Sequence, residues 1–164
     1  MKPSPYKLIL DKCQLANELK EIFIQLCNEG IVQIKINRWI NVNFCLPQKV
    51  HRRLIELSPL SPPITPANIH LCLKKLRPYH TFLLLIEMDH LLQSLPQDVS
   101  PSSVRLIRAS NPLKNLLELS ADADITLSQV FNIVAELVYW GKATIIFPLC
   151  ESNHYMLHPS APTA

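Results

Sequence analysis

The hydrophobic pattern of the chain changes its period at Gly30, and this change constrains the fold more than any other feature. Over residues 11–29, apolar side chains recur every three or four positions, which is the spacing of one helix face. After Gly30 they alternate with polar residues over 32–36 and again over 40–44, as in half-buried strands. The step at 37–38 begins with asparagine, which tolerates the positive φ of a tight hairpin turn. The sequence therefore predicts a helix followed by a β-hairpin, an α+β arrangement.

A proline-rich connection follows this first unit. Four prolines between Pro59 and Pro66 remove backbone donors and hold each preceding residue in extended geometry. A short helix is expected over residues 67–76, and the apolar run 82–86 predicts a strand that is buried on both faces. We expect this strand to join the hairpin in one α+β layer.

The last third of the chain has the signals of several short helices and a closing hairpin. Ser100 and Asn111 each precede a proline, the order of an N-cap and the first helical position. Thr126 and Gln129 match a capping box, which begins a helix that ends at Gly141. Two short strands are then expected, and their residue ranges are 143–147 and 155–157. Helix, turn, helix and hairpin form the order of a winged-helix domain.

The second helix of this pattern carries no basic residue. In a DNA-binding helix-turn-helix, this helix enters the major groove, and Lys and Arg neutralise phosphates. Here the exposed side is expected to present Ser128, Gln129, Asn132 and Glu136, a neutral to acidic face. Gln129 and Asn132 can pair with adenine, so a winged-helix DNA-binding regulator is the alternative function. Because phosphate contacts are missing, we expect protein contact at Gln129 and Asn132 and no nucleic-acid partner.

Composition argues against the common cofactor and metal sites. The chain has only two glycines, Gly30 and Gly141, and both end expected helices, so no glycine-rich phosphate loop can form. Cys150, His154 and His158 are spaced by four residues, but a structural zinc site takes four ligands and no fourth is identifiable. We therefore expect no cofactor and no metal.

The cysteines are predicted to be reduced thiols of the core. Their number is odd and no two form a C-x-x-C pair. They are Cys13, Cys27, Cys45, Cys72 and Cys150. A cysteine nucleophile requires a base beside it, and His70 points to a different side of its helix from Cys72. We expect no catalytic residue; an enzyme with dispersed catalytic residues is a third class, to which no constellation points.

Five further residues are candidates for protein contact. Arg52 and Arg53 fit either an arginine finger, which neutralises charge in GTP hydrolysis, or a solvated helix face. Trp39, Tyr139 and Trp140 are candidate interface anchors, and core packing is the alternative for each. The net charge of +3 is too small to indicate nucleic acid.

The sequence offers no candidate for a membrane span. Its longest apolar run, residues 82–86, is far shorter than the roughly 20 residues that a spanning helix needs. The first residues lack the pattern of a secretory signal. We expect an intracellular protein without direct membrane insertion.

Several motifs resemble one known family. Residues 38–47, RWINVNFCLP, and residues 77–80, RPYH, resemble the nitrogen permease regulator 3-like proteins. The stretch LVYWGKA at 137–143, with Pro-Leu-Cys at 148–150, is similar to the central region of that family. The resemblance covers most of residues 38–159.

The resemblance implies a non-catalytic scaffold or adaptor subunit of the first GATOR complex. That complex promotes GTP hydrolysis on Rag GTPases and restrains TOR complex 1 signalling when amino acids are scarce. The implied partners are the nitrogen permease regulator 2-like subunit, the DEP-domain subunit and, through the complex, the Rag GTPases. The catalytic arginine is expected on the 2-like partner, and the implied location is the cytoplasm with recruitment to the lysosomal or vacuolar surface.

The resemblance also implies a domain order, because family members join a longin-type domain to a winged-helix segment. The expected parts are a partial longin-like antiparallel sheet with helices over 1–99, including the proline-rich connection at 59–66, a winged-helix domain over 100–159 and a tail over 160–164. Met1 enters late relative to the family's longin domain, and family members continue beyond Ala164. We therefore expect a fragment or a short isoform.

Overall fold

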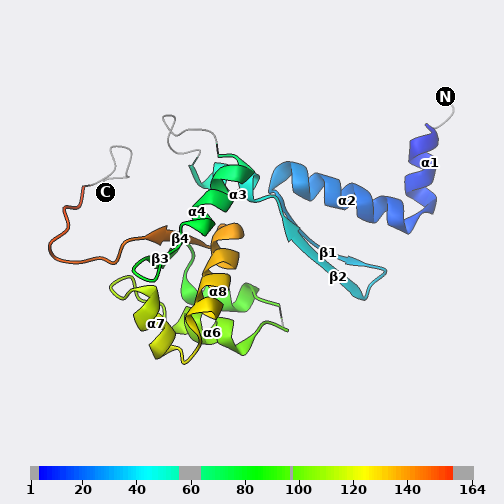
Figure 1. Ribbon diagram of the computed structural model, residues 1–164. Helices are drawn as coiled ribbons and strands as arrows, with labels where there is room; N and C mark the ends of the chain where they lie inside the picture. The colour runs from blue at the N-terminus through cyan, green and yellow to red at the C-terminus, as the bar shows by residue number, and fades with distance from the viewer. Residues whose placement is uncertain (1–3, 56–63, 97, 157–164) are drawn as a thin grey trace, which may run out of the picture.

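The structure is a computed structural model, which describes residues 4–55, 64–96 and 98–156. It confirms an α+β protein with small antiparallel sheets. An arm made of the first two helices and the first hairpin projects from a body that contains the other strands and most other helices (Figure 1). The elements are described from the arm to the body.

The arm begins with α1 (Pro5–Lys12) and α2 (Gln14–Asn28), which are separated by an extended Cys13. The expected helix over 11–29 is thus confirmed as α2, but it begins later than predicted and a second helix precedes it. Gly30 ends α2 with a φ of 75°. This conformation is easily reached only without a Cβ atom, so the expected role of this glycine is confirmed.

The predicted hairpin is confirmed as β1 (Ile31–Ile36) and β2 (Ile40–Cys45), which pair antiparallel. Asn37 and Arg38 both have positive φ, 51° and 69°. The Trp39 N–H donates to the Ile36 carbonyl at 3.3 Å, which closes the turn. Two consecutive positive φ values match the twist of the flanking strands, so the turn joins them without splaying.

Two helices connect the arm to the body: α3 (Pro47–Ile55) and α4 (Pro66–Lys74). The Thr65 side chain caps α4 by accepting a hydrogen bond from the Asn68 N–H. Helix α4 confirms the helix expected over 67–76, with an end two residues earlier. Of the proline-rich connection expected at 59–66, residues 59–63 lie outside the described residues.

The body contains the remaining elements. They are β3 (Thr81–Leu84), α5 (Met88–Ser94), α6 (Pro101–Arg108), α7 (Leu116–Asp122), α8 (Leu127–Tyr139) and β4 (Ala143–Ile146). The Ser100 cap of α6 and the capping box at the start of α8 are confirmed. The cap predicted at Asn111 is wrong, because its side chain closes a turn by accepting from the Leu113 N–H at 2.9 Å. Asn115 caps α7 instead, in a capping box with Glu118.

The strand expected over 82–86 exists as β3, but two predictions about it are wrong. It pairs with β4 and not with the hairpin. Phe82 is buried while Leu83 and Leu85 are 41% and 43% exposed, so only one side of the run 82–86 is buried. A strand of a two-stranded sheet packs one face on the core and leaves the other open, which explains why the apolar run alone was misleading.

The second strand expected at 155–157 is also wrong for the residues that the structure describes. Tyr155 and Met156 are exposed and form no strand, and residue 157 lies outside the described part. The Tyr155 hydroxyl accepts from the Cys150 N–H and donates to the Cys150 carbonyl, both at 2.9 Å. These bonds close residues 150–155 into a loop, so this segment does not continue into a strand beside β4.

A single hydrophobic core fills the body. It is built from residues of α5, α6, α7, α8, β3 and β4, together with Leu76, which follows α4. Its buried members are Leu76, Phe82, Leu91, Leu106, Ile107, Leu116, Leu119, Ala123, Val130, Val134, Leu137, Val138 and Ala143. The core therefore includes residues from both sides of residue 100.

Four of the five cysteines contradict the prediction of core thiols. All five are free, but only Cys45 is buried. On an amphipathic helix, apolar sequence neighbours lie about 100° away, so they do not decide which side a cysteine faces. Cys72, for example, lies on an exposed side of α4 although leucine flanks it on both sides.

Candidate protein-interaction site

The C-terminal end of α8 forms the junction between arm and body. The last carbonyls of a helix have no partner within it. Here the Val138 carbonyl lies 2.7 Å from His51 Nε2 of α3, and the Tyr139 carbonyl accepts from the Cys45 thiol of β2 at 3.8 Å. Groups from two arm-side elements thus satisfy the end of a body helix.

Gly141 completes this junction. It has a φ of 65°, and the next residue, Lys142, donates its N–H to the Leu137 carbonyl at 2.8 Å. A Cβ atom at Gly141 would lie 2.6 Å from Val50 Cγ1 and 3.3 Å from Leu54 Cδ1. Helix α3 therefore approaches the end of α8 so closely that only glycine fits.

The Cys45 thiol at the junction is not a nucleophile at neutral pH. Burial, and then the nearby charge of Glu136, raises its pKa to about 11. Because only a thiolate attacks or binds metal, the raised pKa makes the side chain a packing and hydrogen-bonding group.

The predicted contact residues lie in three places. Arg52 and Arg53 are exposed on α3, and the half-buried Tyr139 and Trp140 lie at the end of α8, so these four are on elements that meet at the junction. Trp39 lies at the hairpin tip with 77% of its surface exposed, at the far end of the arm from the body (Figure 1). The exposed Trp39 side chain contradicts core packing there.

Gln129 and Asn132 form the third place, at the start of α8. Both are exposed, but Gln129 Oε1 accepts from the Thr126 N–H and hydroxyl, each at 3.1 Å. The side chain is therefore engaged in the cap. Helix α8 has no Lys or Arg, so its exposed face offers no cation to a phosphate backbone. The DNA-binding alternative is accordingly not favoured.

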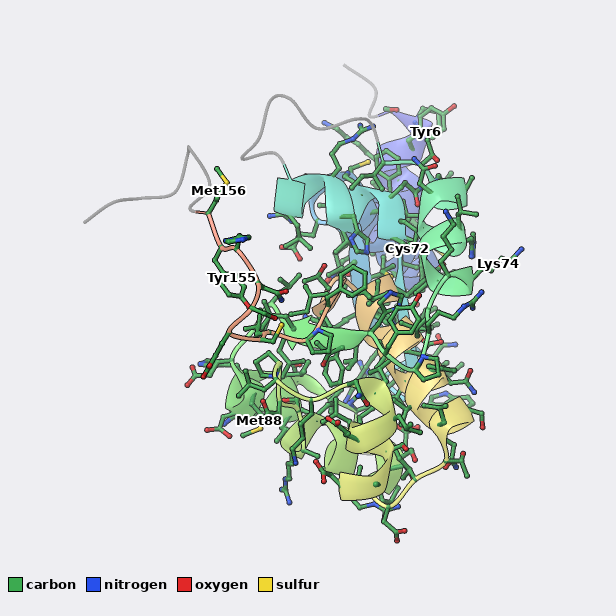
Figure 2. The ribbon with its side chains drawn as sticks, turned by 60° about the vertical axis from the view of Figure 1, so that its left-hand side comes forward. Tyr6, Cys72, Lys74, Met88, Tyr155 and Met156 are labelled. Atoms are coloured by element: carbon green, nitrogen blue, oxygen red, sulfur yellow. The ribbon has the colours of Figure 1, made fainter. Side chains whose placement is uncertain are left out.

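An apolar stripe on α2 is exposed. Leu15, Leu19 and Phe23 follow one another by four positions and are each at least half exposed, and no residue of α1 or α2 is buried. A hydrogen bond joins another side of the helix to the hairpin, where Gln25 Oε1 accepts from the Gln33 N–H at 3.1 Å. The side chain of Tyr6 on α1 also points into solvent (Figure 2). Periodicity revealed this face but not that it stays open.

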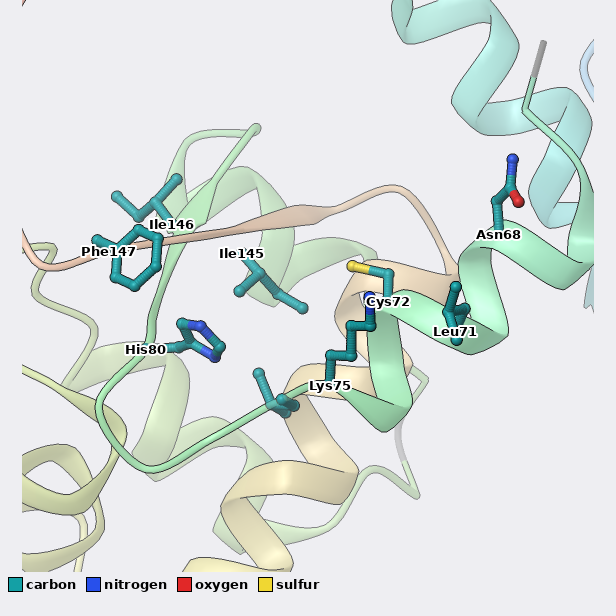
Figure 3. A pocket seen from close by; sticks show the side chains of 9 residues that line it. Asn68, Leu71, Cys72, Lys75, His80, Ile145, Ile146 and Phe147 are labelled. Atoms are coloured by element: carbon teal, nitrogen blue, oxygen red, sulfur yellow. The ribbon is translucent and has the colours of Figure 1, made fainter. Parts of the chain in front are cut away.

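A groove between α4 and β4 was missed entirely. It has a volume of about 430 Å³ and includes His80 and Phe147 among its lining residues (Figure 3). The motif at residues 77–80 contains the aromatic Tyr79 and His80, but their pairing with Phe147 depends on strand register. No local sequence signal predicts that pairing.

The described residues contain no group of three or more His, Cys, Asp or Glu that could hold a metal ion, and His158 of the predicted partial site lies outside them. Within the same part of the chain, no helix is both long and apolar enough to cross a membrane.

Comparison with known proteins identifies the family. The family described as nitrogen permease regulator of amino acid transport activity 3 matches residues 3–164. The chain belongs to this nitrogen permease regulator 3 family. It is 38% identical over 156 residues, 95% of its length, to the GATOR complex protein NPRL3 of Drosophila melanogaster, and it covers 25% of that relative.

More distant members agree. The chain is 28% identical over 86% of its length to the GATOR complex protein NPRL3 of Caenorhabditis elegans, of which it covers 26%. It is 25% identical over 90% of its length to the nitrogen permease regulator 3-like protein of Schizosaccharomyces pombe, of which it covers 27%. This member of the nitrogen permease regulator 3 family thus spans about a quarter of the length of these relatives, which confirms the expected fragment.

Proposed function

We propose that this chain is part of a non-catalytic adaptor subunit of a GATOR complex that promotes GTP hydrolysis on Rag GTPases and so restrains TOR complex 1 signalling when amino acids are scarce. The observation that carries the proposal is the family match over residues 3–164, together with relatives named as GATOR complex proteins. In this proposal the protein acts in the cytoplasm and is recruited to the lysosomal surface.

The proposed partners are the nitrogen permease regulator 2-like subunit, the DEP-domain subunit and, through the complex, the Rag GTPases. We assign the catalytic arginine to the 2-like subunit. Arg52 and Arg53 then serve as surface charges of α3, where both are exposed. Contacts at Trp39, Gln129, Asn132, Tyr139 and Trp140 remain part of the proposal.

The arm is the proposed surface for the 2-like subunit. Its support is the α2 stripe, because a contiguous apolar surface on a folded protein commonly marks a protein interface. Exposed aromatic residues add to it, since Phe23 and Trp39 are large side chains of the kind that anchor interfaces. We further propose that residues 1–99 are a partial longin-like domain and that residues 100–159 are a winged-helix domain used for protein contact.

Co-purification with the nitrogen permease regulator 2-like protein tests the proposal. The test variant is the double substitution Leu19→Glu with Phe23→Glu, which places two charges on the exposed stripe. The matched control is Leu117→Glu on α7, a leucine that is 56% exposed against 55% for Leu19. We expect the wild type and the control to retain the partner and the stripe variant to lose it.

Two results separate the parts of the proposal. If the wild-type protein does not retain the 2-like subunit, membership of the complex through this region is wrong. If the stripe variant and the control retain it equally, the assignment of the arm as the contact surface is wrong. Circular dichroism of each variant checks that the fold is unchanged.

A further inference from the structure

The groove between α4 and β4 has one wall from each element. Leu71, Cys72 and Lys75 lie on the α4 side, and Ile145 and Phe147 lie on the β4 side. Cys72 and Ile145 approach the groove from opposite walls (Figure 3). No residue of β3 lines it, so the groove runs along the side of β4 that is turned away from its partner strand.

Within the part of the chain that the structure describes, no backbone hydrogen bond reaches β4 on this side. The Leu85 N–H donates to the Lys142 carbonyl at 2.9 Å, and hydrogen-bonded pairs alternate along an antiparallel ladder. Thr144 therefore bonds to β3, whereas the N–H and C=O of Ile145 point to the opposite edge. Among the described residues, β4 has no other strand neighbour. An open strand edge beside a groove is the geometry that accepts an added strand.

An aromatic cluster closes one end of the groove. The rings of Tyr79 and Phe147 stack with centroids 6.3 Å apart and an interplanar angle of 7°, and the His80 ring meets Phe147 edge-on at 5.2 Å. Phe147 is 66% exposed. The rings add apolar surface to the groove and remain exposed to solvent. Exposed aromatic side chains are typical binding anchors.

The charged residues of the described helices and strands nearest the groove have one sign. Helices α3 and α4 and strands β3 and β4 contain no Asp or Glu. Lys75 lines the groove, and the Lys74 side chain extends from the same helix into solvent (Figure 2). The ion pairs found in the described part of the chain are formed by Arg105 and by Lys114, neither of which lies at the groove. The rim therefore carries positive charge that an acidic ligand would neutralise.

We propose that the α4–β4 groove binds an extended peptide segment of a partner protein, which adds to the open edge of β4 as a strand. Alternate apolar side chains of the segment enter the groove between Leu71 and Ile145, and acidic side chains face Lys75. Main-chain hydrogen bonds supply affinity, while the groove and the basic rim select the sequence. This inference goes beyond the proposed GATOR role and does not depend on it.

Binding of short blocked peptides tests the inference directly. The probe is a labelled eight-residue peptide of alternating valine and glutamate, and binding is followed by fluorescence anisotropy with the whole chain. One control peptide replaces every glutamate with lysine. A second control keeps the side chains but carries N-methyl groups on alternate amides, which lie along one edge of the extended peptide. It is made in two versions, one for each edge. One of the two versions therefore cannot donate hydrogen bonds to β4.

Protein variants locate the site. Leu71→Glu is expected to weaken binding at least tenfold, because it buries a charge in the apolar groove. Lys75→Glu should weaken it about fivefold at low salt. The control for Leu71→Glu is Leu15→Glu, since Leu15 and Leu71 are 51% and 52% exposed. The control for Lys75→Glu is Lys20→Glu. Both controls should bind the peptide as the wild type does. Phe147→Ala probes the same groove without adding a charge.

The expected result also includes slower hydrogen exchange at the Ile145 amide when the glutamate peptide binds. The inference is overturned if the valine–glutamate peptide shows no binding at millimolar concentration, or if the lysine peptide binds equally well. It is also overturned if Leu71→Glu and Phe147→Ala both bind the peptide as tightly as Leu15→Glu does. The same holds if both N-methylated peptides bind as tightly as the unmodified one. Displacement of the peptide by duplex DNA at low micromolar concentration would overturn it as well. No GATOR subunit is used, so failure here leaves the co-purification result intact.

Discussion

Replacing Gly141 by alanine should destabilise the protein at the junction between arm and body. The loss of stability should be larger than for the same replacement at Gly30. Alanine at a φ of 65° costs about 1–2 kcal/mol. Its Cβ would also lie 2.6 Å from Val50 Cγ1, and relieving such an overlap in a packed site costs about 1–3 kcal/mol more. The expected loss in the free energy of unfolding is therefore about 2–5 kcal/mol.

Two comparisons separate the backbone cost from the overlap. Gly30→Ala has a similar backbone cost, with a φ of 75°, and its Cβ would lie 3.0 Å from Lys49 Cβ, a milder overlap than the one at Gly141, so we expect a smaller loss of about 1–3 kcal/mol. In a Val50→Ala background the closest obstructing methyl group is gone, and the milder contact with Leu54 Cδ1 at 3.3 Å remains. There, Gly141→Ala should cost mainly the backbone part, about 1–2 kcal/mol.

Urea unfolding provides the measurement. Far-ultraviolet circular dichroism reports the helices, and the fluorescence of Trp140, next to the substituted glycine, reports the junction. Agreement between the two signals supports a single transition. The reasoning is refuted if Gly141→Ala costs less than about 1 kcal/mol, or if its cost is the same within about 0.5 kcal/mol in both Val50 backgrounds.

Two further predictions concern the ends of α8. The raised pKa of Cys45, about 11 against 9.0, means that the folded state holds its proton more tightly, so the stability contributed by the neutral thiol is complete below pH 9 and is lost as the pH rises toward 11. In urea unfolding, the free energy of unfolding of the wild type should fall by about 1 kcal/mol more than that of Cys45→Ala between pH 8 and 10.5. An equal fall for both proteins would contradict the raised pKa of Cys45. At the start of α8, Thr126→Ala should lower the free energy of unfolding by about 1 kcal/mol through loss of the cap. The control Asn132→Ala, at an exposed position six residues later, should change it by less than about 0.5 kcal/mol. Equal effects would show that the capping box contributes little.

The features that were predicted correctly are local. The hairpin turn depends on Asn37 and Arg38, and the capping box depends on two residues three positions apart, Thr126 and Gln129. Such signals act through the backbone of their own neighbourhood, so the sequence reports them directly. The cap predicted at Asn111 failed because the same local chemistry also closes a non-helical turn, and a second asparagine at position 115 competes for the helix start.

The candidate site was less predictable. Trp39 was chosen as a candidate interface anchor for its large ring, and its 77% exposure contradicts the alternative of core packing, but the groove beside Phe147 was not found. Its two walls come from segments far apart in the chain, and neither wall carries a motif. The apolar stripe of α2 shows the opposite case, in which the periodicity was correctly read but did not show whether the face is covered.

The sequence by itself determined the α+β class, the hairpin, several helix caps and the family, because turns, caps and motifs depend on residues within a few positions of one another. Only the tertiary structure decided that β3 pairs with β4, that α3 closes on Gly141, and that the α2 stripe and the α4–β4 groove stay open. These outcomes depend on packing between distant segments. Several strand partners satisfy the same alternation of apolar residues, and the competition among them is settled by the shape of the whole core.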